Sequence, residues 1–301
     1  MNRPLSILLI SLCLQSCCWF QDCTEPGPPP EKELPQFADI PQAVSLNTGH
    51  LAEISGIAPS YRFTDHLWVL EDSGNEAALH LLRNDGTVIR KVSFAGANRD
   101  WEDLATGPGP QTGVNYLYIG EIGDNNATYG DYYVYRFGEP TDGQTGIDSY
   151  DTIHFRYPGH TSYDAETLLV DPASLDIYII TKNQLNVRVY RLPYPQDTAG
   201  INVAEFMGTI RYFLIVSGDV SPDGSEVLLK TYNALYYWKR ETGENLYQVL
   251  SRNHDLTAPY TLEPQGEAVC WDTRAAGYYT LSEKGSNPEM PPLYYYPKIN
   301  K

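Results

Sequence analysis

The sequence predicts an all-β protein, a five-bladed β-propeller of four-stranded blades. One observation is that five segments, each of about 50 residues, repeat one order of strand-like runs. A second is that the 24 tyrosines fall mostly in short runs bounded by Gly, Pro, Asn and Asp, which is typical of strands and tight turns. A third is that one strand-like run near the N-terminus, Gln42–Leu46, is left over while the last repeat lacks one strand.

Each repeat opens with a polar residue that is followed by small and apolar residues, and we interpret these runs as the innermost strands of the blades. They are Ser55–Ala58, Glu102–Ala105, Glu166–Leu169, Asp219–Pro222 and Glu267–Cys270. Apolar second strands that end in polar residues follow, at Leu67–Asp72, Leu117–Glu121, Ile177–Lys182, Val227–Thr231 and Tyr278–Glu283. The third strands are often aromatic, at Leu79–Leu82, Tyr132–Arg136, Val187–Arg191, Leu235–Lys239 and Leu293–Tyr296.

A fourth strand follows in four repeats, for example Val88–Val92 and Thr152–Arg156, but the fifth repeat stops after its third strand. Pairing Gln42–Leu46 with this last repeat would complete blade five and close the ring, which removes the open edges of a linear array. The alternative of six blades requires a further repeat that the sequence does not contain. A β-sandwich is also possible but does not explain the shared order of the repeats.

The first residues form a targeting segment, because Arg3 precedes an apolar run that is too short to span a bilayer. The run ends in Leu14–Cys17, which resembles the lipobox of bacterial lipoproteins; a plain secretory signal is the alternative. The resemblance implies a signal peptide over 1–16, a Cys17 that carries several acyl chains such as palmitate, and a place in the bacterial cell envelope, facing the periplasm or the cell surface. A Pro-rich linker over 17–40 would then lead to the propeller domain over 41–301, and the membrane would be reached through the lipid anchor alone.

The formal net charge is −17, so the surface repels nucleic acid and anionic lipid and favours divalent cations. Four of the five cysteines lie in or beside the targeting segment, which leaves Cys270 alone in the body of the chain. The domain therefore lacks the cysteines for a disulfide framework, and we expect Cys270 to be a buried thiol. We expect a monomer.

Propeller geometry brings the polar starts of the inner strands together on one face of the ring. The predicted inner ring consists of Ser55, Glu102, Glu166, Asp219 and Glu267. So many carboxylates around a narrow axis cannot all ionise without a counter-charge, and Ca²⁺, with six to eight oxygen ligands in flexible geometry, suits five blades. The alternative is that the carboxylates bond to backbone amides or arginines, with water in the channel. Zinc is not expected, because the six histidines show no zinc-site spacing.

The second strands end on the same face, somewhat further from the axis. Glu71 and Glu121 end two of them, whereas Lys182 and Lys230 occupy similar places in blades three and four. If a reaction takes place at this face, Glu71, Asp103 or Glu121 is the candidate base and Lys182 or Lys230 the candidate group that steadies developing negative charge. The alternative is ordinary loop charge joined by salt bridges.

Five segments resemble the repeat starts of calcium-binding propellers of the phytase-like and esterase-like group, namely Glu102–Ala105, Glu121–Asn125, Asp164–Thr167, Asp219–Gly224 and Gln265–Ala268. The five repeats are also similar to those of the five-bladed calcium-activated nucleotidases, the apyrases. The resemblance implies an axial Ca²⁺ and, as an expectation, hydrolysis of a phosphoric ester or anhydride in a small anionic substrate. The alternative is a non-catalytic surface module that binds a glycan, a peptide or a protein and contains a structural Ca²⁺.

Overall fold

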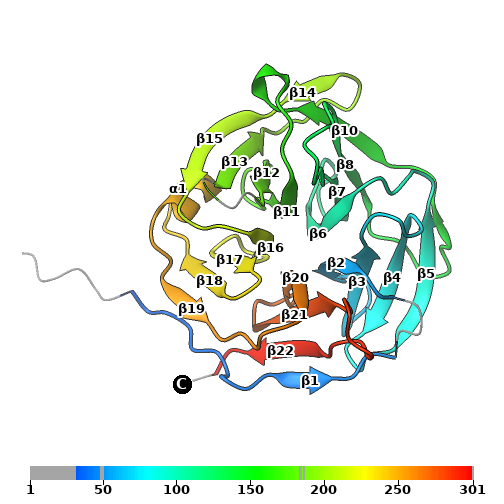
Figure 1. Ribbon diagram of the computed structural model, residues 1–301, viewed down its shortest axis with the longest axis vertical. Coiled ribbons are helices and arrows are strands. Elements are labelled where there is room, and N and C mark those ends of the chain that lie inside the picture. Colours follow the sequence, from blue (N-terminus) through cyan, green and yellow to red (C-terminus); the bar gives the residue numbers. More distant parts are fainter. Residues whose placement is uncertain (1–31, 48–50, 183–184, 186, 300–301) are drawn as a thin grey trace, which may run out of the picture. The chain divides into compact units, whose positions relative to one another are not determined.

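The computed structural model describes residues 32–47, 51–182, 185 and 187–299, and it shows five sheets arranged around a central axis (Figure 1). The predicted five-bladed β-propeller is therefore confirmed. The predicted signal peptide, Cys17 and most of the Pro-rich linker lie outside the described residues. Within the part of the chain that is described, no helix is both long and apolar enough to cross a membrane.

Blade one contains β2 (Ile54–Pro59), β3 (His66–Glu71), β4 (Ala78–Arg83) and β5 (Val88–Phe94). Blade two contains β6 (Trp101–Pro108), β7 (Asn115–Glu121), β8 (Tyr132–Gly138) and β10 (Asp151–Arg156). Blade three contains β11 (Ala165–Val170), β12 (Ile177–Thr181), β13 (Val187–Leu192) and β15 (Glu205–Ile210). Blade four contains β16 (Ile215–Val220), β17 (Glu226–Thr231), β18 (Leu235–Lys239) and β19 (Leu256–Ala258). Blade five contains β20 (Gln265–Trp271), β21 (Gly277–Glu283), β22 (Leu293–Pro297) and β1 (Gln42–Val44).

The four strands of each blade pair antiparallel from the axis outward. Two short strands are added in parallel to the rims of blades one and two, β9 (Gly146–Ile147) on β5 and β14 (Ile201–Val203) on β10. Each of them comes from the connection between the third and fourth strands of the following blade, so these connections also strap neighbouring blades together. The two helical segments that the structure describes are a short 3₁₀ turn (Pro158–His160) and α1 (Leu246–Ser251).

The N-terminal strand closes the ring as predicted, because β1 pairs antiparallel with β22 (Figure 1). The closure begins before β1: the Ala38 amide donates to the Pro297 carbonyl at 2.9 Å, and Phe37 is buried. The Phe37 ring packs on Tyr278 with a centroid distance of 4.9 Å. Residues that sequence composition places in the linker therefore anchor the last blade.

The hydrophobic core consists of five clusters, and each cluster fills the space between two neighbouring blades. Four fully buried tryptophans mark these interfaces, namely Trp68, Trp101, Trp238 and Trp271. Cys270 is buried between blades five and one, as predicted. Because each sheet packs on a neighbour through both of its faces, the strands near the axis read as nearly continuous apolar runs.

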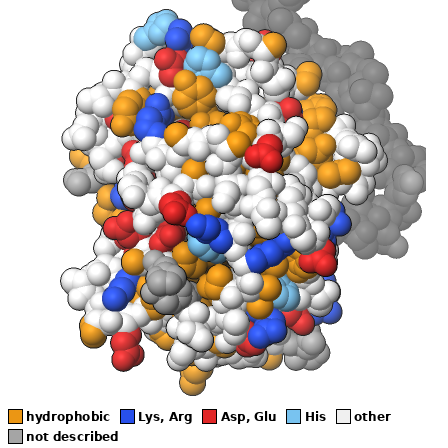
Figure 2. All heavy atoms as spheres, turned by 90° about the vertical axis from the view of Figure 1, so that its right-hand side faces the viewer, with side chains coloured by type: hydrophobic (Ala, Val, Ile, Leu, Met, Phe, Trp, Pro, Cys, Tyr) orange, Lys and Arg blue, Asp and Glu red, His pale blue; other side chains and the backbone are white. Residues whose placement is uncertain are grey.

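The outer side of the ring near β4 and β5 carries acidic, basic and hydrophobic side chains in a mixed pattern (Figure 2). The charges there pair locally, as in the contact between Lys91 and Glu76 and in the 2.7 Å ion pair between Arg83 and Asp85. A second group of carboxylates lies at the face where the inner strands begin, and there the carboxylates outnumber the cations beside them.

Candidate functional site

Each inner strand contains a β-bulge close to its start, which shows as a shift in pairing register with the second strand. A bulge inserts one extra residue, bends the strand and redirects a side chain. The bulges lie at Ser55, Glu102, Glu166 and Val216 and, in blade five, at Gly266 and Glu267. The structure thus places four of the five residues of the predicted inner ring at one equivalent position.

Asp219 requires a correction, because it does not begin an inner strand. Strand β16 starts at Ile215, and Asp219 lies near its far end. The apolar Val216 occupies the bulge of blade four, so no polar residue marks the start of that strand in the sequence. Asp219 accepts hydrogen bonds from the amides of Val220 and Trp271, both at 2.8 Å, and so joins blade four to blade five.

The face at which the inner strands begin, which we call the channel mouth, holds two groups of carboxylates that share Glu102. In one group an oxygen of Glu102 lies with oxygens of Asp72 and Asp100, and in the other with oxygens of Asp164 and Glu166. Within each group the three oxygen atoms lie within 4.8 Å of one another. We call these five residues the acidic cluster.

Three members of the acidic cluster do not belong to the predicted ring: Asp72, Asp100 and Asp164. Asp100 and Asp164 each stand two residues before a bulged glutamate, in the short patterns Asp100–Glu102 and Asp164–Glu166. The repeated spacing of acid, any residue, acid is therefore the signal in the sequence that could have found them. Asp72 directly follows the predicted Glu71, and its amide donates to the Glu53 carbonyl at 2.9 Å.

Glu166 has one oxygen that the protein leaves without a hydrogen-bond partner. Its Oε1 forms an ion pair with Lys182, whereas the buried Oε2 makes no hydrogen bond in the described structure. The side chain is only 4% exposed, so water does not freely compensate for the missing bond. Burial raises the pKa of Glu166 well above its usual range, although Lys182 opposes the shift.

The other carboxyls of the cluster also resist ionisation. Burial, followed by the charges of Glu166 and Asp72, raises the pKa of Glu102 well above its usual range. Burial raises the pKa of Asp72 to about 6, and it raises the pKa values of Asp100 and Asp164. A bound cation would remove this penalty, because an adjacent opposite charge favours the ionised form.

Gly123 lies against the acidic cluster in the segment that follows β7. A Cβ atom at this position would overlap Glu102 Oε1 and crowd the carboxylate of Asp100. Glycine thus lets the backbone approach two carboxylates closely, and donor atoms can converge there.

If the acidic cluster binds a divalent cation, Gly123→Ala should weaken that binding by roughly tenfold or more, because the added methyl group would displace Glu102 and Asp100. Gly130→Ala is the matched control, since a Cβ there meets no atom within 4 Å. Calcium titration by calorimetry measures both variants, and equal affinities would contradict the role of Gly123.

Lys182 is the predicted outer residue that lies at the acidic cluster. Its Nζ pairs with Glu166, lies 3.9 Å from Glu267 Oε1 and sits 5.4 Å from the ring centroid of Tyr232. The Tyr232 hydroxyl donates to Glu267 Oε1 at 2.5 Å. Burial and the neighbouring Glu267 also raise the pKa of Glu283 to about 9. The channel mouth therefore has two parts: the acidic cluster, and a neighbouring group in which Lys182, Tyr232 and Glu283 surround Glu267.

Three other residues predicted for the site bond within the fold. Glu121 accepts from the Asp100 amide at 2.8 Å and the Arg99 amide at 3.0 Å, so it orders the loop that leads into β6. Asp103 is fully buried and accepts from the Leu168 amide at 2.9 Å, which joins blades two and three.

Lys230 is likewise fully buried. It contacts the Gly266 carbonyl and lies 3.3 Å from Glu263 Oε2 and 3.0 Å from the Tyr260 hydroxyl. Glu71, the remaining predicted residue, accepts from the Ala52 amide at 2.8 Å beside the acidic cluster. Ser55 donates to the Trp101 carbonyl at 3.1 Å and links blades one and two.

No known protein family and no curated protein sequence matches this chain. Among solved structures, a gluconolactonase from Xanthomonas campestris is similar, with a TM-score of 0.45 and 12% sequence identity over 82% of this chain and 72% of the gluconolactonase chain. At this identity the similarity concerns the fold alone. The fold is also the part of the predicted resemblance to calcium-binding propellers that the structure confirms.

Proposed function

We propose that the channel mouth binds a divalent cation, Ca²⁺ by preference, and that the protein is a calcium-dependent hydrolase of phosphoric esters or anhydrides. The observation that carries this proposal is the buried, unpartnered Oε2 of Glu166 within the acidic cluster. A buried carboxylate oxygen without a donor is costly unless a cation occupies the space in front of it.

The donor set suits a hard cation. Both groups of the acidic cluster consist of carboxylates alone, without histidine or cysteine. Such oxygen ligands favour Ca²⁺, Mg²⁺ or Mn²⁺, and Ca²⁺ tolerates the uneven geometry of ligands from several blades better than octahedral Mg²⁺ does. Glu102, Asp164 and Glu166 would hold the ion, with Asp72 and Asp100 adding ligands or water-mediated contacts.

A bound Ca²⁺ would polarise a phosphoryl oxygen and lower the pKa of a coordinated water molecule. The residues of the chain would orient the substrate around it. Lys182 is 21% exposed beside Glu166, where its ammonium can pair with negative charge on the substrate. Glu71 and Asp72 at the end of β3 lie at the same mouth, and their carboxylates are the candidates to accept a proton from water.

Assays of ATP, phytate and p-nitrophenyl phosphate, with Ca²⁺ and with a chelator, test the hydrolase. We expect calcium-dependent turnover of at least one substrate, and we expect Lys182→Gln to lower kcat by roughly tenfold or more because a charge-stabilising group is removed. Absence of turnover on all three would overturn the hydrolase while leaving cation binding intact.

One observation favours a second candidate, a surface binding module for a glycan, peptide or protein with a structural Ca²⁺. Three residues predicted for catalysis, Asp103, Glu121 and Lys230, have their polar atoms bonded to the fold. The cation would then tie blades one to three together. Calcium-dependent stabilisation without turnover, together with retention of a ligand from envelope extracts, would support this candidate over the hydrolase.

The free energy of unfolding should depend on pH in two opposite ways: without Ca²⁺ it should fall as the pH rises, whereas the stabilisation by Ca²⁺ should grow as the pH rises. In the absence of Ca²⁺, the raised pKa values mean that the folded state binds protons more tightly than the unfolded chain. The associated stability is fully present below about pH 4 and is lost as the pH rises through about 6, the pKa of Asp72, and further toward about 9, the pKa of Glu283.

With Ca²⁺ the carboxylates must be ionised, so we expect affinity to fall by roughly tenfold or more between pH 8 and pH 5. Melting curves at pH 5, 6.5 and 8, with Ca²⁺ or a chelator, measure both trends. A calcium-induced shift of equal size at pH 5 and pH 8 would contradict the assignment.

The lipid anchor remains a prediction from the sequence. We propose that Cys17 is acylated and tethers the propeller to the envelope, where the substrate or ligand is met. Labelling with a palmitate analogue tests this, and unchanged labelling of the Cys17→Ala variant would rule it out.

A further inference from the structure

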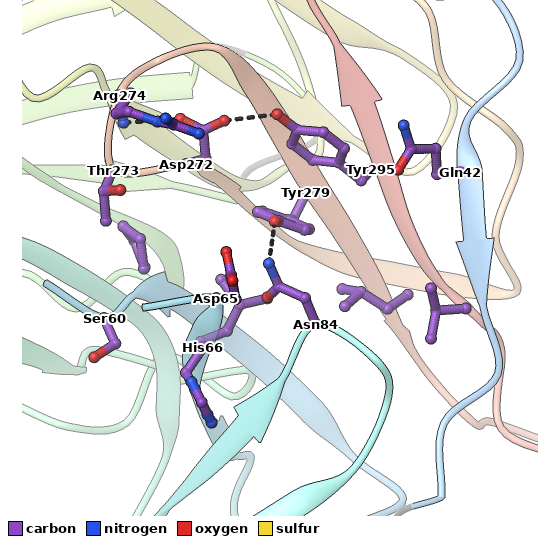
Figure 3. Close-up of a pocket in the computed structure, with 14 residues that line it drawn as sticks. Gln42, Ser60, Asp65, His66, Asn84, Asp272, Thr273, Arg274, Tyr279 and Tyr295 are labelled. Carbon is purple, nitrogen blue, oxygen red and sulfur yellow. Dashed lines mark hydrogen bonds between the residues drawn. The ribbon is translucent and has the colours of Figure 1, made fainter. Parts of the chain in front are cut away.

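A cavity of about 290 Å³ lies at the seam where β1 closes the ring, on the face opposite the channel mouth. Its walls come from strands β1, β21 and β22 of blade five and from blade one, at the end of β2 and the start of β3. Figure 3 shows Asp272, Thr273 and Arg274 along one wall, with Asp65, His66 and Asn84 on the facing side. The cavity is at the small end of the range for ligand sites, which suits a compound the size of one amino acid.

The cavity contains a buried hydrogen-bond acceptor that the protein does not use. Asn84 Nδ2 donates to the Tyr279 hydroxyl at 2.6 Å, as the dashed line in Figure 3 shows, whereas the buried Asn84 Oδ1 has no hydrogen-bond partner in the described structure. A buried amide oxygen normally has a donor. A ligand that offers N–H groups would supply it.

Two opposite charges at the cavity are also without partners. Among the described residues, neither the Asp65 carboxylate nor the Arg274 guanidinium forms an ion pair or a side-chain hydrogen bond, although both line the cavity. Asp272, by contrast, is satisfied: it accepts from the Tyr295 hydroxyl at 2.7 Å and from the amides of Arg274 and Ala276. The available charges are therefore one acid and one base, on facing walls.

Part of the remaining lining is apolar, beside the polar residues Gln42, Ser60, His66 and Thr273. Val44 and Leu293, which are paired across β1 and β22, line the cavity together with Pro59 and Leu67. Tyr279 and Tyr295 lie with their ring centroids 4.6 Å apart and form an aromatic wall. An aliphatic side chain would be removed from water against these residues.

From these features we infer that the seam cavity binds a free α-amino acid with an aliphatic side chain. The ligand ammonium group would bond to Asp65 and, once the Asn84 side chain turns its buried Oδ1 toward the cavity, to that oxygen as well; the ligand carboxylate would bond to the planar guanidinium of Arg274. Each unpartnered group of the cavity thereby acquires a partner of the correct kind. A dicarboxylate would be repelled by the negative charges of Asp65 and Asp272, and a polyamine would be repelled by the positive charge of Arg274, so both classes of ligand fit the cavity less well. The inference does not depend on the cation at the channel mouth.

The purified protein should be screened by melting temperature against the twenty standard L-amino acids and glucose. L-leucine should then be titrated by calorimetry beside N-acetyl-L-leucine, which lacks the ammonium group, and L-leucinamide, which lacks the carboxylate. We expect saturable binding of L-leucine and binding of each analogue that is weaker by roughly tenfold or more, because a charge-assisted contact is lost.

Asp65→Asn should abolish discrimination against N-acetyl-L-leucine, and Arg274→Gln should abolish discrimination against L-leucinamide. Both side chains are exposed, so the variants should fold, and Asp142→Asn and Arg211→Gln are matched exposed controls far from the cavity in sequence. Failure of every amino acid to bind, or binding of glucose in preference, would overturn the inference. Glu166→Gln should leave leucine binding unchanged, so this result and that of the cation site are separable.

Discussion

Replacing Glu166 with glutamine should abolish stabilisation of the protein by calcium. The wild-type protein at a Ca²⁺ concentration of 100 times Kd should gain about 2.7 kcal/mol in unfolding free energy. Glu166→Gln keeps the size of the side chain but removes the charge that the unpartnered Oε2 presents to the acidic cluster. We therefore expect the calcium-induced rise in melting temperature to disappear, together with any calcium-dependent turnover.

The control for this experiment is Glu289→Gln, which removes a charge from an exposed position outside the acidic cluster. Far-ultraviolet circular dichroism establishes that both variants are folded before the titration. If Glu166→Gln binds Ca²⁺ as tightly as the wild type, the ion is not held by this carboxylate and the proposed site is wrong.

Replacing Phe37 with alanine should lower the free energy of unfolding by about 3–5 kcal/mol, a large fraction of the stability of a typical domain. Phe37 is buried and packs on Tyr278 of blade five and Tyr237 of blade four, with centroid distances of 4.9 and 5.8 Å. The substitution leaves a cavity between these blades at the point where the chain closes the ring.

Denaturant unfolding measures the loss, and Phe213→Ala is the control because Phe213 is 59% exposed. We expect the control to change stability by less than about 0.5 kcal/mol. A Phe37→Ala variant as stable as the control would show that the segment before β1 does not contribute to closure. A chain that begins at residue 41 should show the same defect, since it lacks Phe37.

The fold was predictable because propeller blades are repeats, and each repeat had to contain the same strands in the same order. The unused run Gln42–Leu46 and the missing strand of the last repeat predicted the closure that β1 and β22 make. Phe37 was not predictable as core, because a single aromatic residue in a Pro-rich segment carries no periodic pattern. Only the tertiary contacts with blades four and five reveal its burial.

The candidate site was predictable where an acidic residue opens an inner strand that continues with small and apolar residues. Glu102, Glu166 and Glu267 meet this condition, whereas Val216 in blade four does not, and the sequence pattern there favours Asp219 instead. The direction of side chains at the ends of the second strands was not predictable, because it depends on their register with the inner strands, and a shift of one residue turns a side chain to the other face. Lys230 therefore points into a buried group with Glu263 rather than into the mouth.

The pairing of β1 with β22 also has a consequence for the time order of folding. Of the strands that the structure describes, the first needs the last as its partner, so blade five cannot be complete until both have been synthesised. Contacts between residues so distant in sequence are slow to form, because the intervening chain must be ordered first. Until the ring closes, Phe37 lacks its contacts with Trp271 and Tyr278 of blade five. A nascent chain is therefore an open ring that needs protection from aggregation until its two ends meet.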